Sequence, residues 1–188
     1  ATSLGARFER VATDAGDARG YTTMGTAGNQ VAEANAFNAK NRDKSDNNWD
    51  LAALARYTPS ATQNIEFGFA RKVRSPNLHE RYTWSSWPMA ATMNNFVGDG
   101  NGYVGNPDLK PEIAHTLAAT FDWHAADRSW EFKATPYYTR VSDYIDAVRT
   151  ATFGVNQFNV LAYANQSARL VGLDLSGHMP LLKTGLGS

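Results

Sequence analysis

The 188-residue chain contains no cysteine, which excludes disulfides, thiolate metal sites and cysteine nucleophiles. It also has no net charge, because 18 basic residues balance 18 acidic ones, and this balance is not typical of nucleic-acid-binding proteins. No apolar run approaches the roughly 18 residues that a membrane-spanning helix needs, and no signal peptide is recognisable. A β-barrel in a membrane stays compatible with the low mean hydropathy, because its strands alternate apolar and polar residues.

Sequence motifs of common enzymes are also missing. We find no nucleophile elbow, metalloprotease helix, phosphate-binding loop or dinucleotide fingerprint. The segment Asp99-Gly100-Asn101-Gly102 resembles the start of a calcium loop, but the further acidic ligands and the terminal Glu are absent, which favours a glycine-rich turn. The sequence therefore predicts a protein that is not an enzyme.

Alternation with period two predicts an all-β chain. The expected strands span about 3–12, 49–58, 63–73, 112–123, 130–149 and 159–178. Each reaches the roughly 9 to 11 residues with which a tilted strand crosses a bilayer. In the strand 112–123 one face is mostly apolar, and His115 falls on that face, which favours a girdle or buried histidine over a metal ligand.

The strand 130–149 changes its pattern along its length. Its apolar residues fall on one parity up to Tyr138 and on the other from Val141 onward. A bulge or a change of environment between these two residues would explain the switch.

The connections alternate in length. Two are short, at about 59–62 and 124–129, whereas those at about 13–48 and 74–111 are long and rich in Gly, Asn, Asp and Thr. Outer-membrane barrels alternate short periplasmic turns with long extracellular loops. A soluble β-sandwich with extended loops, for example a carbohydrate-binding module that uses exposed Trp and Tyr, has the same strand pattern. The pattern alone leaves both architectures open.

The segment Gly105-Asn106-Pro107-Asp108-Leu109-Lys110-Pro111-Glu112 ends the second long loop. Pro107 fixes a turn dihedral, and the flanking Asn and Asp can bond their own backbone. Pro111 favours an extended conformation for Lys110. We expect a turn that leads directly into a strand.

Four ordered segments resemble those of TonB-dependent outer-membrane receptors. They are 67–82, which reads FGFARKVRSPNLHERY, then 105–112, then Tyr137-Tyr138 with Tyr144-Ile145, and finally Tyr163-Ala164-Asn165 followed by Val171-Gly172-Leu173-Asp174-Leu175. The resemblance assigns a family-signature structural role to Arg74, Pro76, Asn77, Leu78, Glu80, Asn106, Pro107, Leu109, Pro111 and Glu112. The four matches occur in this order across residues 67–175.

This family resemblance implies a transmembrane antiparallel β-barrel of 22 strands with a plug inside. Residues 1–188 would supply about six of these strands, as a partial barrel without the plug domain or the TonB box. The implied location is the bacterial outer membrane. The implied partners are the TonB energy-transducing complex, outer-membrane lipid and lipopolysaccharide, and a metal or metal-chelate ligand, with no nucleic acid.

Several pieces of the chain are similar to TonB-dependent copper receptors: residues 45–49, residues 80–85, Met89, Met93 and Asn94, and residues 98–106. Met89 and Met93 offer thioether sulfur, a soft ligand for Cu(I), and His79 could add an imidazole. Met24 could join them where the loops converge. The alternative is that the two methionines pack locally beneath Trp84 and Trp87. Copper is thus one expected transported ligand, and a siderophore or another metal chelate is the other.

Overall fold

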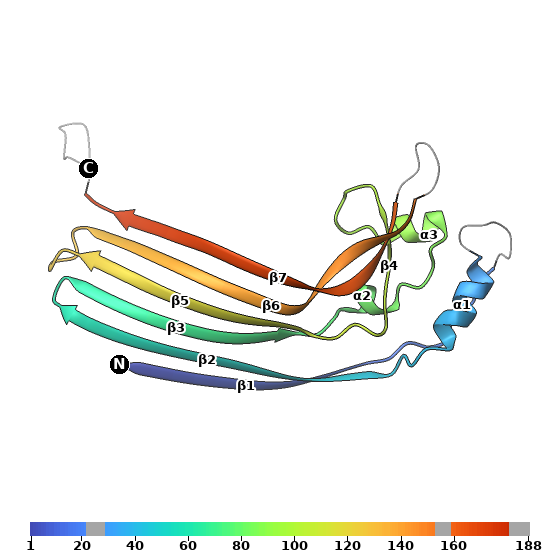
Figure 1. Cartoon of the computed structure of the whole chain (residues 1–188), viewed down its shortest axis with the longest axis horizontal. Helices are drawn as coiled ribbons and strands as arrows, with labels where there is room; N and C mark the ends of the chain where they lie inside the picture. The colour runs from blue at the N-terminus through green and yellow to red at the C-terminus, as the bar shows by residue number, and fades with distance from the viewer. Residues whose placement is uncertain (22–28, 153–158, 181–188) are drawn as a thin grey trace.

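The computed structural model describes residues 1–21, 29–152 and 159–180, which form one sheet. The six long antiparallel strands are β1 (Thr2–Thr13), β2 (Lys44–Ser60), β3 (Gln63–Arg74), β5 (Glu112–His124), β6 (Glu131–Thr152) and β7 (Asn159–His178). The prediction of six strands is confirmed, with ends that extend several residues further in β2 and β6. The strands lie side by side in a single curved layer (Figure 1).

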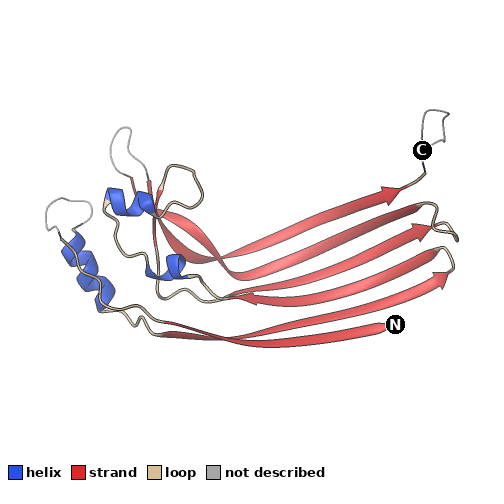
Figure 2. Ribbon diagram, turned by 180° about the vertical axis from the view of Figure 1, so that it is seen from behind, coloured by secondary structure: helices blue, strands red, loops and turns tan. Residues whose placement is uncertain are grey.

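The long connections contain regular structure, although their composition suggests structureless loops. The first contains the helix α1 (Gln30–Asn38), and the second contains α2 (Leu78–Tyr82), α3 (Pro88–Met93) and the short strand β4 (Gly102–Val104). β4 pairs in parallel with β7 and extends the sheet order to β1-β2-β3-β5-β6-β7-β4. These helices lie at one end of the sheet, and the short turns lie at the other (Figure 2). None of the helices in the described ranges is long and apolar enough to cross a membrane.

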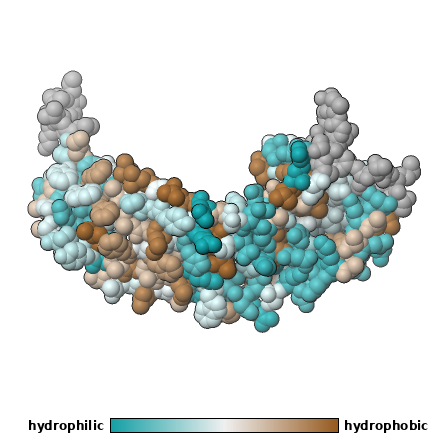
Figure 3. All heavy atoms as spheres, in the orientation of Figure 1, coloured by the Kyte–Doolittle hydropathy of each residue, from teal (hydrophilic) through white to brown (hydrophobic). Residues whose placement is uncertain are grey.

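Directly paired residues share a face of a sheet, so the register assigns every strand residue to one of two faces. The residues that we call the apolar face include Leu4, Phe8, Trp49, Leu51, Phe67, Phe69, Leu117, Phe132, Tyr138, Val171, Leu173 and Leu175. All of these side chains are exposed. Hydrophobic residues gather over the half of the strands toward the short turns, and hydrophilic ones over the middle and the loop end (Figure 3). The alternation read from the sequence is confirmed.

The opposite side, the polar face, has cross-strand hydrogen bonds and ion pairs. Thr116 and Thr139 bond at 2.8 Å, and Thr120 and Thr135 bond at 3.0 Å. Arg56 pairs with Glu66 farther along the sheet. A single layer that exposes an apolar face has no second sheet to bury it, so the described residues do not form the soluble sandwich considered above. An apolar outside and a polar inside are what a membrane barrel requires.

The pattern switch in β6 has two causes. Val141 is on the polar face, opposite Ala114 and Ala168, and it is buried. The bulge lies beyond it, between Ser142 and Tyr144, where Asp143 has a φ of 56°. Of the two expected explanations, the change of environment is confirmed by the burial of Val141, and the bulge lies just beyond the segment from Tyr138 to Val141.

Candidate functional site

The two signature segments meet at the loop end of the sheet. Gly105 donates its backbone N–H to the carbonyl of Thr83 at 2.6 Å, and Asn106 donates to the carbonyl of Glu80 at 2.8 Å. The segment that ends the second loop is thereby fixed against α2, which comes well before it in sequence. We call residues 74–82 and 105–112 together the signature cluster.

α2 begins with a capping box. The Asn77 side chain accepts from the backbone N–H of Glu80 at 2.9 Å, and the Glu80 carboxylate accepts from the N–H of Asn77 at 2.7 Å. Pro76, just before the cap, is buried, whereas Leu78, at the start of the helix, is 59% exposed. Reciprocal capping satisfies two orphan donors and stabilises a helix too short to form alone.

The Glu80 carboxylate also joins an ion-pair network. Arg74 donates to Glu80 at 2.9 Å and to Glu112 at 2.7 Å, and Glu112 also accepts from the N–H of Ile145 at 2.6 Å. The hydrogen bond with Glu112 is the largest cause that raises the pKa of Arg74. Burial raises the pKa of Glu112, but the bonds from Arg74 and Ile145 outweigh it and lower the pKa. These charges join β3, α2, β5 and β6.

The predicted turn at Asn106 is present. The Asn106 side chain accepts from the N–H of Asp108 at 3.0 Å, and the Asn106 carbonyl accepts from the N–H of Leu109 at 3.3 Å. Pro107 and Leu109 are buried, and Pro111 is half-buried before β5. Lys110 exchanges two backbone bonds with the Asn165 side chain, at 2.9 and 3.0 Å. The turn is thus tied to β7 as well as to α2.

Sequence reasoning missed Arg81, which is the most buried charged side chain of the described residues at 1% exposure. Its guanidinium donates to Asp46 of β2 at 2.7 Å, to the Thr13 hydroxyl at 3.1 Å and to the carbonyl of Leu109 at 3.4 Å. No local pattern identifies it, because arginine is usually exposed and these partners are distant in sequence.

The candidate metal ligands lie elsewhere on the loop. Met89 and Met93 are 58% and 76% exposed on α3, so the alternative that they pack beneath the tryptophans is wrong. The exposed His79 ring packs against Phe96, with 4.4 Å between centroids. Met24 lies outside the described residues.

His115 is exposed on the apolar face, so of the two expected positions the buried one is wrong and the girdle position stays a prediction. Its ring stacks on Phe69 of the neighbouring strand, with 6.2 Å between centroids. No three His, Cys, Asp or Glu side chains in the described ranges gather as a metal site.

The two long loops converge. The Glu33 carboxylate of α1 accepts from the N–H of Ser86 at 3.0 Å and also from the hydroxyl groups of Ser85 and Ser86. Beside this contact lies a cavity of about 300 Å³, which we call the loop pocket. Its lining includes Arg19, Tyr21, Gln30, Tyr82, Trp84 and Asn94. Aromatic faces with one guanidinium and two amides suit an aromatic, anionic ligand.

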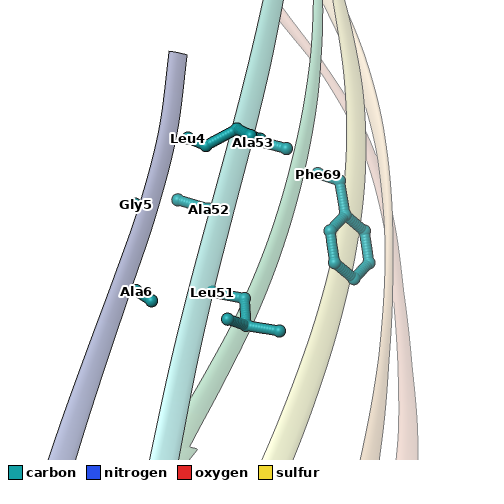
Figure 4. Close-up of a pocket in the computed structure, with 7 residues that line it drawn as sticks. All are labelled: Leu4, Gly5, Ala6, Leu51, Ala52, Ala53 and Phe69. Atoms are coloured by element: carbon teal, nitrogen blue, oxygen red, sulfur yellow. The ribbon is translucent and has the colours of Figure 1, made fainter.

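A larger hollow, of about 410 Å³, lies on the apolar face (Figure 4). Leu4, Leu51 and Phe69 line it from three neighbouring strands, and none of its lining side chains is polar. It can neither orient a ligand by hydrogen bonds nor bind a metal. We therefore assign it to the membrane-facing surface of the sheet.

Residues 1–187 match the family model described as TonB-dependent receptor-like, β-barrel. A hemin receptor of Yersinia enterocolitica is 30% identical over 111 residues, which are 56% of this chain and 16% of that protein. The siderophore receptor PirA of Pseudomonas aeruginosa is similar in fold, with a TM-score of 0.53 and 20% identity over 71% of this chain and 26% of its own.

A double mutant of the Serratia marcescens hemophore receptor HasR, solved with its hemophore HasA and heme, gives a TM-score of 0.49 and 18% identity over 94% of this chain and 27% of its own. The chain thus spans 16% of the hemin receptor and about a quarter of the solved receptors. Members of the matched family are transport receptors of the Gram-negative outer membrane, not enzymes. The match over nearly the whole chain, on an open sheet with an apolar and a polar face, shows that this chain belongs to the TonB-dependent receptor β-barrel family.

Proposed function

We propose that the chain forms part of an outer-membrane receptor that takes up heme or a related iron chelate, with energy supplied through TonB. The observation that supports this ligand class is the loop pocket, in which Tyr82 and Trp84 lie near Arg19. Heme is a flat aromatic group with two carboxylates, so aromatic faces and a guanidinium complement it. The name of the Yersinia relative, a hemin receptor, points to the same class.

Transport requires a barrel that crosses the membrane and a path through it. The apolar face supplies the lipid-facing side, and the hydrogen-bonded polar face would line the lumen. The plug and its TonB contact are expected from the family and would be supplied by the rest of the receptor.

The test is hemin titration of the full-length receptor in detergent, followed by absorbance. We expect Trp84→Ala and Arg19→Gln each to raise the Kd about tenfold, which corresponds to about 1.4 kcal/mol. Trp130→Ala is the matched control, because Trp130 precedes β6 at the short-turn end. Equal hemin affinity in all four proteins, or no hemin binding, would refute the proposal. Uptake that persists in cells without TonB would refute the energised step.

Copper is a second candidate. Met89 and Met93 lie four residues apart on α3, and both sulfur-bearing side chains are exposed on the same loop as His79. Residues four apart share a helix face, so the two sulfurs can approach one ion. Titration of the full-length receptor with Cu(I) and Cu(II) tests this: a Met89→Ile/Met93→Ile variant should lose Cu(I) affinity, and unchanged affinity would remove both as ligands.

A further inference from the structure

The loop pocket contains few side chains that could bind iron directly. Heme iron in proteins is bound by His, Cys, Met or Tyr side chains. Among these residue types, the described lining of the pocket contains only two tyrosines, Tyr21 and Tyr82. A tyrosine ring can pack against any flat ligand, whereas a phenol oxygen can bind a metal only where it is free of other partners. The hydrogen bonds of the two tyrosines therefore determine which of them can bind iron.

The phenol of Tyr82 is already bonded within the loops. Its hydroxyl lies 2.8 Å from the carbonyl of Arg42, 3.0 Å from the carbonyl of Thr13 and 2.8 Å from the Thr13 hydroxyl. These contacts join α2 to both ends of the first long loop. Removal of the phenol proton would leave two carbonyl oxygens without their donor and facing an anion. Tyr82 thus joins the walls of the pocket and is not available to a metal.

The phenol of Tyr21 is free. The side chain is exposed, and within residues 1–21, 29–152 and 159–180 its hydroxyl has no hydrogen-bond partner. Arg19, two residues earlier, lines the same pocket and likewise makes no hydrogen bond or ion pair within these ranges. The guanidinium thus stays available for a carboxylate of the ligand, and the phenol oxygen stays available for its metal.

The backbone that carries these two side chains is fixed to α1, at the loop end of the sheet (Figure 1). Ala18 exchanges two hydrogen bonds with the Asn38 side chain, at 2.8 and 2.9 Å. The N–H of Tyr21 donates to the buried Gln30 side chain at 3.2 Å, and a Cβ at Gly20 would overlap the backbone of Gln30. Residues 18–21 are thus held at both ends of the helix. A metal-binding side chain on a fixed backbone loses less freedom when it binds.

We propose that the Tyr21 phenolate binds the ferric iron of hemin as an axial ligand when hemin occupies the loop pocket. As the oxygen–iron bond forms, the phenol releases its proton to water and the iron stays ferric. Phenolate oxygen is a ligand that proteins use for heme iron. The inference rests on the proposed function and narrows its ligand class, because a chelate whose iron is already fully coordinated would leave no position for Tyr21.

The experiment compares two probes on the full-length receptor in detergent, hemin and the iron-free protoporphyrin. The two probes share the ring and both carboxylates, so only a direct bond to iron distinguishes them. Tyr21→Phe keeps the aromatic ring and removes the oxygen, and Tyr21→His supplies a different heme ligand. Tyr57→Phe is the matched control, because Tyr57 is an exposed tyrosine near the short-turn end of β2. Absorbance gives the Kd, and electron paramagnetic resonance identifies the ligand of the ferric iron.

We expect Tyr21→Phe to raise the Kd for hemin about tenfold, which corresponds to about 1.4 kcal/mol, and to leave the Kd for the iron-free ring unchanged. The ferric phenolate signature should be present in the wild type and in Tyr57→Phe and absent from Tyr21→Phe. Tyr21→His should recover hemin affinity with the signature of a nitrogen ligand.

An equal change in the Kd of both probes would overturn the proposal, because Tyr21 would then act through its contact with the ring. Retention of the phenolate signature in Tyr21→Phe would also contradict it. Hemin that binds with an affinity dependent on Trp84 but without the phenolate signature would refute this assignment and leave the proposed function standing. A receptor that binds neither probe would refute both. The shift of the folded band on unheated gels verifies that each variant folds.

Discussion

Arg81 of α2 donates a 2.7 Å hydrogen bond to Asp46 of β2. This bond anchors the second long loop to a strand that comes much earlier in the sequence. The side chains are 1% and 11% exposed, so little water screens the pair. Removing one member of a buried pair leaves the other charge without compensation, which costs about 3 to 5 kcal/mol. The signature cluster depends on this anchor, because the same guanidinium also reaches the carbonyl of Leu109.

We therefore expect Arg81→Ala to open the signature cluster locally. Amide hydrogen exchange of α2 in the full-length receptor should accelerate more than about 100-fold, the equivalent of about 3 kcal/mol. Arg128→Gln is the control, because Arg128 pairs with Glu131 in a short turn at 57% exposure, where an ion pair contributes about 1 kcal/mol at most. Unchanged protection of α2 after Arg81→Ala would show that the buried pair is not the anchor.

Acid should weaken the Arg74–Glu112 contact. Burial raises the pKa of Glu112, but the bonds from Arg74 and Ile145 outweigh it, so the pKa is lowered in the folded chain. A carboxylate whose pKa is lowered by folding stabilises the folded chain at any pH above its pKa in the unfolded chain, which is about 4.3 for Glu. This stabilisation is lost as pH falls through the pKa in the folded chain. The Tm of the wild type should therefore fall more between about pH 6 and about pH 3.5 than that of Glu112→Gln. Glu9→Gln, an exposed carboxylate, should keep the wild-type slope.

The strands are predictable from the sequence because their pattern is local. The loop architecture is not, because it depends on contacts between residues that are distant in sequence. Alternation is a local signal, since Leu117 and Phe69 face lipid through the same period two that their own strands display. Burial of Arg81 depends on Asp46 and Thr13, which no window around position 81 contains. The three-residue strand β4 is likewise defined by its partner β7.

Some of the loop is predictable in principle. Asn77 followed three residues later by Glu80 is the sequence pattern of a capping box, which indicates a helix start within the segment that the family resemblance identifies. Asn29 at the start of α1 is a second N-cap residue, and it accepts from the N–H of Ala32. These caps are difficult to distinguish from turns in the sequence, because the loops are rich in Gly and Asn and both residue types also favour turns.

Tyr103 of β4 should ionise at a higher pH than an ordinary tyrosine. Burial, together with a 2.7 Å hydrogen bond to Asp99, raises the pKa of Tyr103 to about 12. The pKa of tyrosine in the unfolded chain is about 10. The raised pKa of Tyr103 therefore stabilises the folded chain at neutral pH, and this stabilisation is lost as pH rises from about 10 to 12. When tyrosinate absorbance is measured against pH, the component that ionises at the highest pH should be absent in Tyr103→Phe. A Tyr21→Phe control, at a 91% exposed tyrosine, should retain it, and a missing late component in the wild type would contradict the assignment.

Gly105 should not tolerate a side chain. A Cβ there would lie 2.9 Å from three backbone atoms, the carbonyl carbon of Arg81, the carbonyl oxygen of His79 and the nitrogen of Thr83. Backbone atoms cannot move aside as a side chain can, so Gly105→Ala must separate the last turn of the loop from α2 and break the 2.6 Å bond to Thr83. We expect faster exchange of α2 amides and faster proteolysis of the second loop.

Alanine substitutions at two further glycines serve as comparisons for Gly105→Ala. Gly16→Ala is the neutral control, since no atom lies within 4 Å of the place that its Cβ would take. At Gly172 the obstacle is the ring of Tyr137, so Gly172→Ala should be relieved by a second change, Tyr137→Ala. No side-chain change should relieve Gly105→Ala, because its obstacle is backbone. Normal protection of α2 in Gly105→Ala would mean that the two signature segments do not need their close contact. The anchoring role of Arg81 would then have to act through Asp46 and Thr13.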